Sequence, residues 1–234
     1  ESMSTITDRA NAILSTDNEI LLYHGSKNAV DKPIYGKGKS DNDYGRGFYL
    51  TLNKNLACEW AALYGYENSC YLNTYMLNTS DLKILELDSR NTIEWISILY
   101  ANRGPGQDVV VNADYHNWLM SNVRKDINEY DCITGMRADD SYYRFVNMFV
   151  SGTFTDRQVN RMLNAGNLGK QFVLMSKEAF DRIKFLGADE LDFKYWKRLA
   201  EKRDRITRDT LFEVQRDSYS IKNGKTIRDY VYNK

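Results

Sequence analysis

Two glycine-containing stretches carry the residue types best suited to hold a ligand. "LYHGS" ends in His24, Gly25 and Ser26, and "GRGFYLT" contains Gly47 and Tyr49. A histidine ring can donate or accept a hydrogen bond, and a glycine lets a ligand approach the backbone closely. A flat ligand could lie against the ring of Tyr49. The alternative is structural, with His24 in a turn and the second stretch forming a turn into a core strand.

Two more residues would extend such a site. Trp60 lies eleven residues after Tyr49 on a predicted helix, and its ring could lie opposite the tyrosine to form a slot for a planar ring. Aromatic faces stabilise cationic rings by about 0.5–2 kcal/mol. Gln171 opens the predicted strand "QFVLMS". The alternatives are that Trp60 is a core residue and that Gln171 is an ordinary strand-edge residue.

Three other charged residues attract attention for their position. Asp139 and Asp140 form a carboxylate pair, but before Ser141 they indicate a helix N-terminus. Arg103 in the turn "NRGPGQ" could meet a phosphate, although a solvated surface position is favoured.

The hydrophobic pattern predicts a mixture of strands and helices that must position these residues. Strands are expected at 19–26, 47–51, 70–77, 82–88, 130–135 and 171–176. Helices are expected at 4–18, 53–66, 92–102, 112–123, 142–150, 155–163, 177–187 and 190–217. Residues 30–43 read as a loop. Because strands and helices do not alternate regularly, an α+β fold is favoured over a doubly wound sheet.

The composition is typical of a soluble globular chain. It has 234 residues, 42% hydrophobic and 27% charged, with a formal net charge of zero, so no global field draws it to nucleic acid or membrane. Three cysteines and two histidines show no paired ligand spacing, which argues against a disulfide framework or a metal site. No run approaches the roughly 18–20 apolar residues of a membrane helix, and no secretory pattern is recognised. A cytoplasmic protein with reduced thiols is expected.

The C-terminal segment differs from the rest in charge. Between Asp192 and Lys234 there are twelve basic and seven acidic residues. Such an excess could serve a nucleic-acid or protein partner. The interleaved acids favour a solvated helix with i,i+4 pairs, such as Glu201 with Arg205 and Asp204 with Arg208.

Taken in order, the motifs resemble the ADP-ribosyltransferase superfamily, in its diphtheria-toxin and poly(ADP-ribose) polymerase branch. That branch carries a His-Tyr-Glu triad on three strands. "LYHGS" matches its first motif, "GRGFYLT" is similar to its second, and Trp60 matches a second aromatic that follows. "QFVLMSKEAFDRIKFL" matches the third motif with Gln171 in the place of the glutamate. The stretch 19–186 also looks like a bacterial domain-of-unknown-function family within this superfamily.

The resemblance implies an ADP-ribosyltransferase-like split β-sandwich with flanking helices. Residues 1–18 would form an N-terminal helix, 19–188 the transferase-like domain, and 189–234 a charged helical extension.

The resemblance also implies NAD as co-substrate, without a metal. Tyr49 and Trp60 would sandwich the nicotinamide ring, and the Gly25 backbone would bind its amide. His24 would hold the adenosine-side ribose. Ser26 would contact a ribose hydroxyl, and Gly47 would let the ligand approach closely. The catalytic set would be His24, Tyr49 and Gln171.

Gln171 is the departure from the family pattern that matters for chemistry. A glutamine keeps a hydrogen-bonding carbonyl but has no charge and cannot act as a base. Mono-ADP-ribosyl transfer to an acceptor that is already nucleophilic is therefore expected. Glu178 and the two aspartates 139 and 140 are possible substitute carboxylates. Lys37 and Lys39, in the loop where the family's acceptor-facing loop lies, could meet an anionic substrate.

The implied role is a bacterial toxin, of a toxin–antitoxin or phage-defence kind, that modifies a protein or nucleic acid. An antitoxin would be a possible partner, and no membrane is involved. One alternative is a catalytically inactive module that binds NAD or ADP-ribose. Another is a domain that binds a partner through the basic C-terminal helix.

Overall fold

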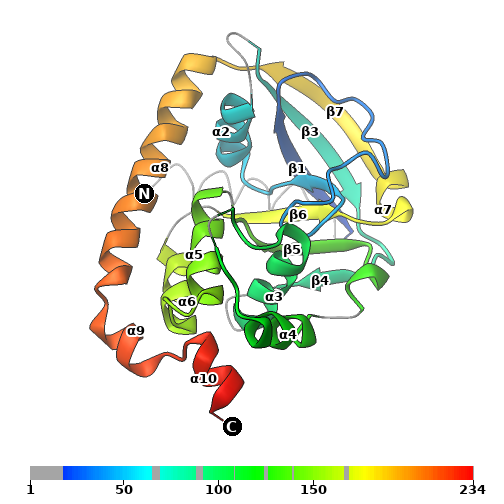
Figure 1. The fold of residues 1–234 in the computed structure, drawn as a ribbon. Coiled ribbons are helices and arrows are strands. Elements are labelled where there is room, and N and C mark those ends of the chain that lie inside the picture. Colours follow the sequence, from blue (N-terminus) through cyan, green and yellow to red (C-terminus); the bar gives the residue numbers. More distant parts are fainter. Residues whose placement is uncertain are drawn as a thin grey trace.

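The computed structural model describes residues 18–64, 69–87, 92–107, 109–123, 126–138, 140–165 and 169–233 of the chain. The predicted helix at 4–18 lies outside the described residues except for Asn18, which is in a turn. Within the described part, the fold is α+β, with two open sheets and flanking helices (Figure 1).

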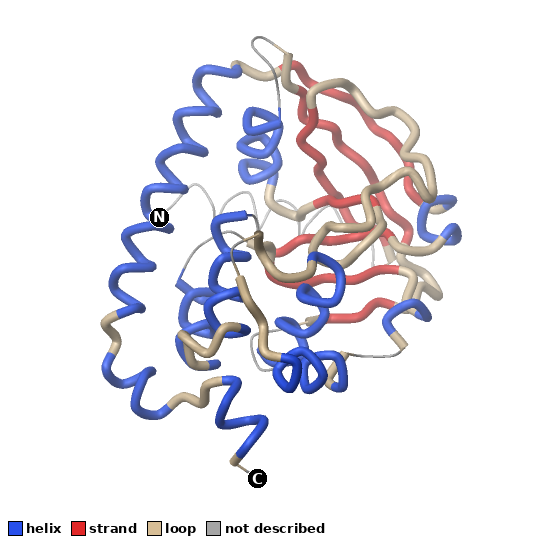
Figure 2. The backbone as a smooth tube through the Cα atoms, viewed as in Figure 1, coloured by secondary structure: helices blue, strands red, loops and turns tan. Residues whose placement is uncertain are grey.

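The first sheet has three antiparallel strands in the order β1 (Glu19–Ser26), β3 (Tyr71–Asn78) and β7 (Ile183–Glu190). The second has four strands in the order β2 (Phe48–Leu50), β6 (Lys170–Leu174), β5 (Cys132–Met136) and β4 (Ile84–Glu86). In it, β4 and β5 are parallel and the other pairs antiparallel. Figure 2 shows the strands of both sheets gathered on one side of the molecule.

Among the described residues, one backbone bridge joins the two sheets. Tyr23 of β1 and Thr51, just after β2, exchange two backbone hydrogen bonds of 2.9 Å. Beyond this bridge the strands diverge. Side chains from the facing surfaces fill the space between the sheets, among them Leu22, Leu50 and Phe172. The split therefore lies next to His24, one residue beyond the bridge on β1.

The helices cover the outer faces. Helix α2 (Lys54–Tyr64) packs on β1 and β3, and the long α8 (Phe193–Gln215) packs along α2. The second sheet is covered by α3 (Thr92–Arg103), α5 (Asp140–Val150) and α6 (Asp156–Ala165). The remaining helices are α4 (Ala113–Ser121), η2 (Ile127–Glu129), α7 (Lys177–Asp181), α9 (Ser218–Asn223) and α10 (Ile227–Tyr232).

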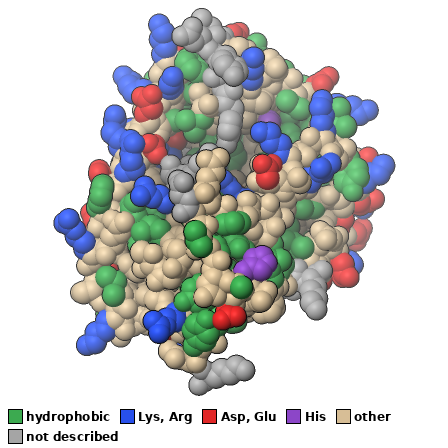
Figure 3. Space-filling model, viewed as in Figure 1, with side chains coloured by type: hydrophobic (Ala, Val, Ile, Leu, Met, Phe, Trp, Pro, Cys, Tyr) green, Lys and Arg blue, Asp and Glu red, His purple; other side chains and the backbone are tan. Residues whose placement is uncertain are grey.

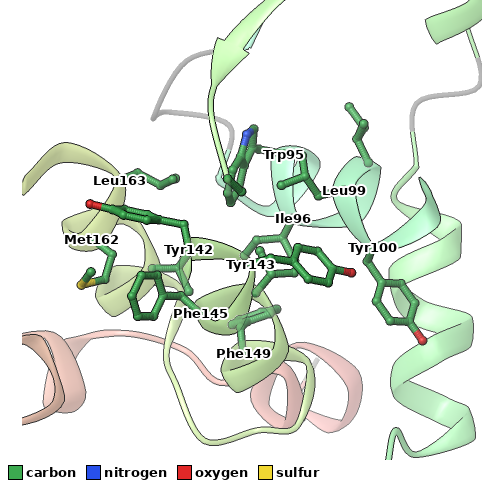
Figure 4. Close-up of a cluster of buried hydrophobic side chains, with 14 of the residues drawn as sticks. Trp95, Ile96, Leu99, Tyr100, Tyr142, Tyr143, Phe145, Phe149, Met162 and Leu163 are labelled. Atoms are coloured by element: carbon green, nitrogen blue, oxygen red, sulfur yellow. The ribbon is translucent and has the colours of Figure 1, made fainter. Parts of the chain in front are cut away.

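The largest hydrophobic cluster lies between the second sheet and its covering helices. In Figure 4, side chains from α3, α5 and α6 point toward one another, with Trp95 and Ile96 facing Tyr142, Phe145 and their neighbours. Tyr49 packs against this cluster, so its side chain lies on the face of the second sheet that these helices cover.

One predicted element is wrong. Residues 177–187 do not form a single helix closed by Gly187, because α7 ends at Asp181 and β7 begins at Ile183. Partly buried Ile183 and Phe185 alternate with exposed neighbours, which is the period of a strand. Pairing of β7 with β3 across the chain outweighs the local helical pattern.

Smaller differences concern element ends. Helix α5 begins at Asp140, two residues before the predicted start at 142. Thr155 caps α6 as predicted, since its hydroxyl accepts from the Gln158 N–H at 3.2 Å. Strand β7 continues to Glu190, past the domain boundary predicted at 188.

Candidate functional site

One cavity of about 990 Å³ opens where the sheets diverge. Its volume is at the upper end of the range that holds a cofactor-sized ligand. Six of the seven residues predicted to bind or react line it, and the seventh, Ser26, does not. Those that line it are His24, Gly25, Gly47, Tyr49, Trp60 and Gln171.

His24 joins the first strand to the second. Its Nδ1 lies 2.7 Å from the carbonyl oxygen of Tyr49. A carbonyl only accepts, so Nδ1 carries the proton and Nε2 of the neutral ring is an acceptor. Desolvation by burial lowers the pKa of His24 below its ordinary value of 6.5. The neutral ring therefore presents an acceptor at physiological pH.

Gly25 has a steric role and exposes a backbone edge. A Cβ at this position would lie 1.9 Å from the carbonyl oxygen of Ala57 and 2.5 Å from the N–H nitrogen of Ala61, both in α2. Tyr23 uses its N–H and C=O to bond to Thr51, on the edge of β1 that faces away from β3. Backbone groups two residues apart in a strand point to the same edge, so the N–H and C=O of Gly25 also face away from β3. These two groups are thus placed to bond a ligand.

The phenol of Tyr49 is already occupied. Its hydroxyl donates to the Gly45 carbonyl at 2.7 Å and accepts from the Tyr44 N–H at 3.0 Å. Burial raises the pKa of Tyr49 far above its ordinary value. The hydroxyl therefore locks the preceding turn, where Gly45 has a φ of +79°. The ring is left as a fixed wall of the cavity, and the hydroxyl is not a proton carrier.

Gln171 lies beside Tyr49 on the neighbouring strand. Tyr49 pairs with Val173, so Gln171 is its diagonal neighbour on the same face of the sheet. The side chain is only 6% exposed, and its Oε1 has no hydrogen-bond partner in the described part of the chain. A buried carbonyl oxygen without a partner costs about 1–3 kcal/mol. A ligand hydroxyl that reaches Oε1 would remove this cost.

Trp60 is a wall residue whose ring is already covered on one side. It is 4% exposed, and the guanidinium of buried Arg137 lies 4.5 Å from its ring centroid. Arg137 follows β5 and is the diagonal neighbour of Gln171 across the β5–β6 pair. The structure shows a cation–π contact between Trp60 and Arg137. Stacking of Trp60 on a ligand ring stays a prediction.

Ser26 lies at the far end of β1 and its hydroxyl is engaged. It donates to the Asn28 carbonyl at 2.6 Å and accepts from the Asn73 side chain at 2.8 Å. The structure therefore gives Ser26 a role in holding the turn after β1, and its contact with a ribose hydroxyl stays a prediction.

Several charged residues take places that the sequence did not indicate. Arg103 is not a solvated surface residue. It donates to Asp43 at 2.8 Å and to the Ala138 carbonyl at 2.9 Å, and it lies over the ring of Tyr143. Asp43 also accepts from the Ala138 N–H at 2.9 Å. Arg103 is half-buried and Asp43 is buried, and the pair forms part of the cavity wall. The 95-residue separation of Asp43 and Ala138 leaves no signal in the sequence.

Of the suggested substitute carboxylates, Glu178 lies away from the cavity. Glu178 is exposed on α7, where it pairs with Arg182 at 2.7 Å, and it does not line the cavity. Asp139 and the side chain of Asp140 lie outside the described part of the chain. Lys37 and Lys39, in contrast, line the cavity from the loop 30–43.

The C-terminal helix contributes to the cavity, which the sequence did not indicate. Residues of α8 line the cavity, and Arg203 makes a bidentate pair with Glu59 of α2, with distances of 2.5 and 2.9 Å. The predicted pair of Asp204 and Arg208 is confirmed at 3.0 Å. Figure 3 shows basic side chains along the edge of the molecule where α8 runs.

Two general features concern ions and membranes. Within the described ranges, no three potential ligand side chains gather to hold a metal ion. The described helices include none that is long and apolar enough to cross a membrane.

The fold and the cavity together define an α+β protein with a ligand-sized cleft at the divergence of two sheets. The chain belongs to the family described as protein of unknown function (DUF3990), whose model matches residues 20–185. The matched region includes every predicted site residue but ends before α8. No curated protein and no solved structure matches the chain.

Proposed function

We propose that the protein is an ADP-ribosyltransferase that cleaves NAD and transfers a single ADP-ribose unit to a macromolecular acceptor. One observation carries the proposal: His24, Tyr49 and Gln171 lie on β1, β2 and β6, and all three line one cavity. This arrangement supports the resemblance to the His-Tyr-Glu branch of the ADP-ribosyltransferases, and with it an ADP-ribosyltransferase-like split β-sandwich.

The roles of the chain's residues follow from their contacts. The Gly25 N–H and C=O would bond the nicotinamide amide, and the Tyr49 ring would lie against the nicotinamide. Nε2 of His24 would accept from a ribose hydroxyl. Oε1 of Gln171 would accept from the 2′-hydroxyl of the ribose that bears nicotinamide. Interactions of this kind accelerate the reaction only as far as they favour the oxocarbenium-like transition state over bound NAD.

The glutamine sets the type of transfer. Gln171 can orient a hydroxyl but cannot remove its proton. The acceptor, protein or nucleic acid, would therefore supply its own nucleophile, and transfer would stop after one unit. Lys37 and Lys39 at the cavity would favour an anionic acceptor. In this proposal the protein acts in the bacterial cytoplasm, as a toxin of a toxin–antitoxin or phage-defence system with a possible antitoxin partner.

Labelled NAD and host lysate provide the test. The wild-type protein should release nicotinamide and label protein or nucleic acid, whereas Tyr49→Ala should do neither. If wild type and Tyr49→Ala are indistinguishable with every acceptor, the transferase proposal is wrong.

A second candidate is an inactive module that binds NAD or ADP-ribose. The observation in its favour is the missing acidic group at position 171. It predicts NAD binding in calorimetry without nicotinamide release. The third candidate, a domain that binds a partner through the basic α8, predicts that partner binding survives Tyr49→Ala and is lost when the chain is truncated near Glu190.

A further inference from the structure

Helix α8 lies outside the region that the family shares, yet it takes part in the cavity. The family match ends at residue 185, and α8 begins at Phe193. Five of its residues, spaced along one face, line the same cavity as His24 and Tyr49: Ala200, Glu201, Arg203, Asp204 and Thr207.

An ion pair that is buried on its Glu59 side fastens α8 to α2. The Glu59 side chain is 6% exposed, and both of its oxygens accept from the guanidinium of Arg203. A bidentate pair of this kind fixes orientation as well as distance. Removing Arg203 would leave the buried Glu59 carboxylate without its charged partner, which is unfavourable.

Helix α2 in turn bears two features of the cavity. Trp60 follows Glu59 directly and is held on its ring face by Arg137. The backbone at Ala57 and Ala61 touches Gly25 so closely that no Cβ would fit between them. A shift of α2 would therefore move Trp60 and disturb the Gly25 edge together.

We propose that α8 is a wall of the substrate cavity and that Arg203, acting through Glu59, is a positioning residue for Trp60 and the Gly25 edge. The ligand here is the NAD of the proposed function, so this part of the inference rests on that function. The proposal that Arg203 holds α2 in place does not depend on any ligand.

The chain offers a matched control for Arg203. Arg208 lies on the same helix and pairs with Asp204, but its side chain is 62% exposed. Arg203→Met and Arg208→Met remove the same charge from the same helix. Arg203→Met alone breaks the ion pair with α2. An effect that comes only from the lost positive charge would therefore appear in both variants.

The experiment measures NAD affinity by calorimetry and amide hydrogen exchange of residues 54–64 in the full chain. We expect Arg203→Met to weaken NAD binding by about tenfold or more and to speed exchange in α2 by a similar factor. Arg208→Met should stay within about twofold of wild type in both. Equal behaviour of the two variants in exchange would overturn the positioning role.

If Arg203→Met does not fold, a second variant tests whether α8 is a wall of the substrate cavity. Glu201 is exposed and lines the cavity, whereas Glu213 is exposed on the same helix and does not line it. Glu201→Trp should weaken NAD binding by about tenfold by occupying the cavity, and Glu213→Trp should not. If Glu201→Trp left NAD binding unchanged, the proposal that α8 is a wall of the substrate cavity would be wrong. If wild type itself binds no NAD, the proposed function fails, and the exchange comparison still decides the role of Arg203.

Discussion

Nδ1 of His24 donates to the backbone carbonyl of Tyr49 at 2.7 Å. This bond ties β1 to β2 at the point where the two sheets separate. It fixes the tautomer of the histidine, and it holds the strand that carries the Tyr49 ring. The two residues that the sequence singled out first are thus parts of one hydrogen-bonded unit.

The protonation of His24 predicts how folding stability depends on pH. Its folded-state pKa lies below 6.5 because burial disfavours the charged ring. Below pH 6.5 the unfolded chain takes up a proton that the folded chain excludes, so stability falls as pH drops, until the folded-state pKa is passed. The loss is at most about 1.4 kcal/mol per pH unit.

Urea denaturation at pH 7.5 and 5.5 measures this effect. His24→Gln can still donate to the Tyr49 carbonyl but does not titrate, so its stability should fall less than that of wild type. Parallel losses in the two proteins would show that His24 is not the group responsible. Because the His24 ring stays neutral between pH 6.5 and 8, we expect the NAD affinity to be constant over this range.

Gln171 predicts opposite effects on stability and on function. Gln171→Leu removes the unpartnered Oε1, so thermal stability should be unchanged or should increase. Nicotinamide release should fall about tenfold or more, because a bond to the ribose hydroxyl would be lost. The matched control is buried Gln158, whose amide bonds to the Thr155 N–H and the Val214 carbonyl at 3.0 Å each. Gln158→Leu should destabilise the fold, and full activity of Gln171→Leu would contradict the role assigned to the amide.

The two glycines 25 and 187 predict a contrast in stability. A Cβ on Gly25 would lie 1.9 Å from the Ala57 carbonyl oxygen, whereas nothing lies within 4 Å of a Cβ on Gly187. Gly25→Ala should therefore cost about 3 kcal/mol or prevent folding, because backbone must move. Gly187→Ala should be close to neutral. Thermal melts of the two variants make the comparison, and similar melting temperatures would mean that α2 can shift freely.

The pair of Arg103 and Asp43 predicts a large loss when it is broken. Arg103→Met leaves the buried Asp43 carboxylate without its guanidinium partner, with the Ala138 N–H still bonded to it, at a cost of about 3 kcal/mol. Lys177→Met, which removes an exposed i,i+4 pair with Asp181, should change stability very little. Chemical denaturation compares the two. A small effect of Arg103→Met would indicate that water reaches Asp43 and replaces the guanidinium.

The sequence by itself determined the local elements and the residue types of the site. The strand at 19–26, the loop 30–43 and the helix after Tyr49 follow from short-range periodicity and glycine turns, which depend on near neighbours. His24 could be selected near the end of a predicted strand and Tyr49 after a glycine turn, whereas Gln171 could be selected only through the resemblance to the His-Tyr-Glu family pattern. The wrong helix at 177–187 shows the limit, since β7 is stabilised by its pairing with β3.

Only the tertiary structure decided how distant residues act on one another. Arg103 and Asp43 are 60 residues apart, and Arg203 and Glu59 are 144 apart. Neither pair has a spacing that a sequence pattern can reveal. The occupied hydroxyls of Ser26 and Tyr49 likewise depend on contacts made only after folding. Side-chain type is encoded at each position, but burial, partner and pKa arise from packing between segments that are remote in the chain.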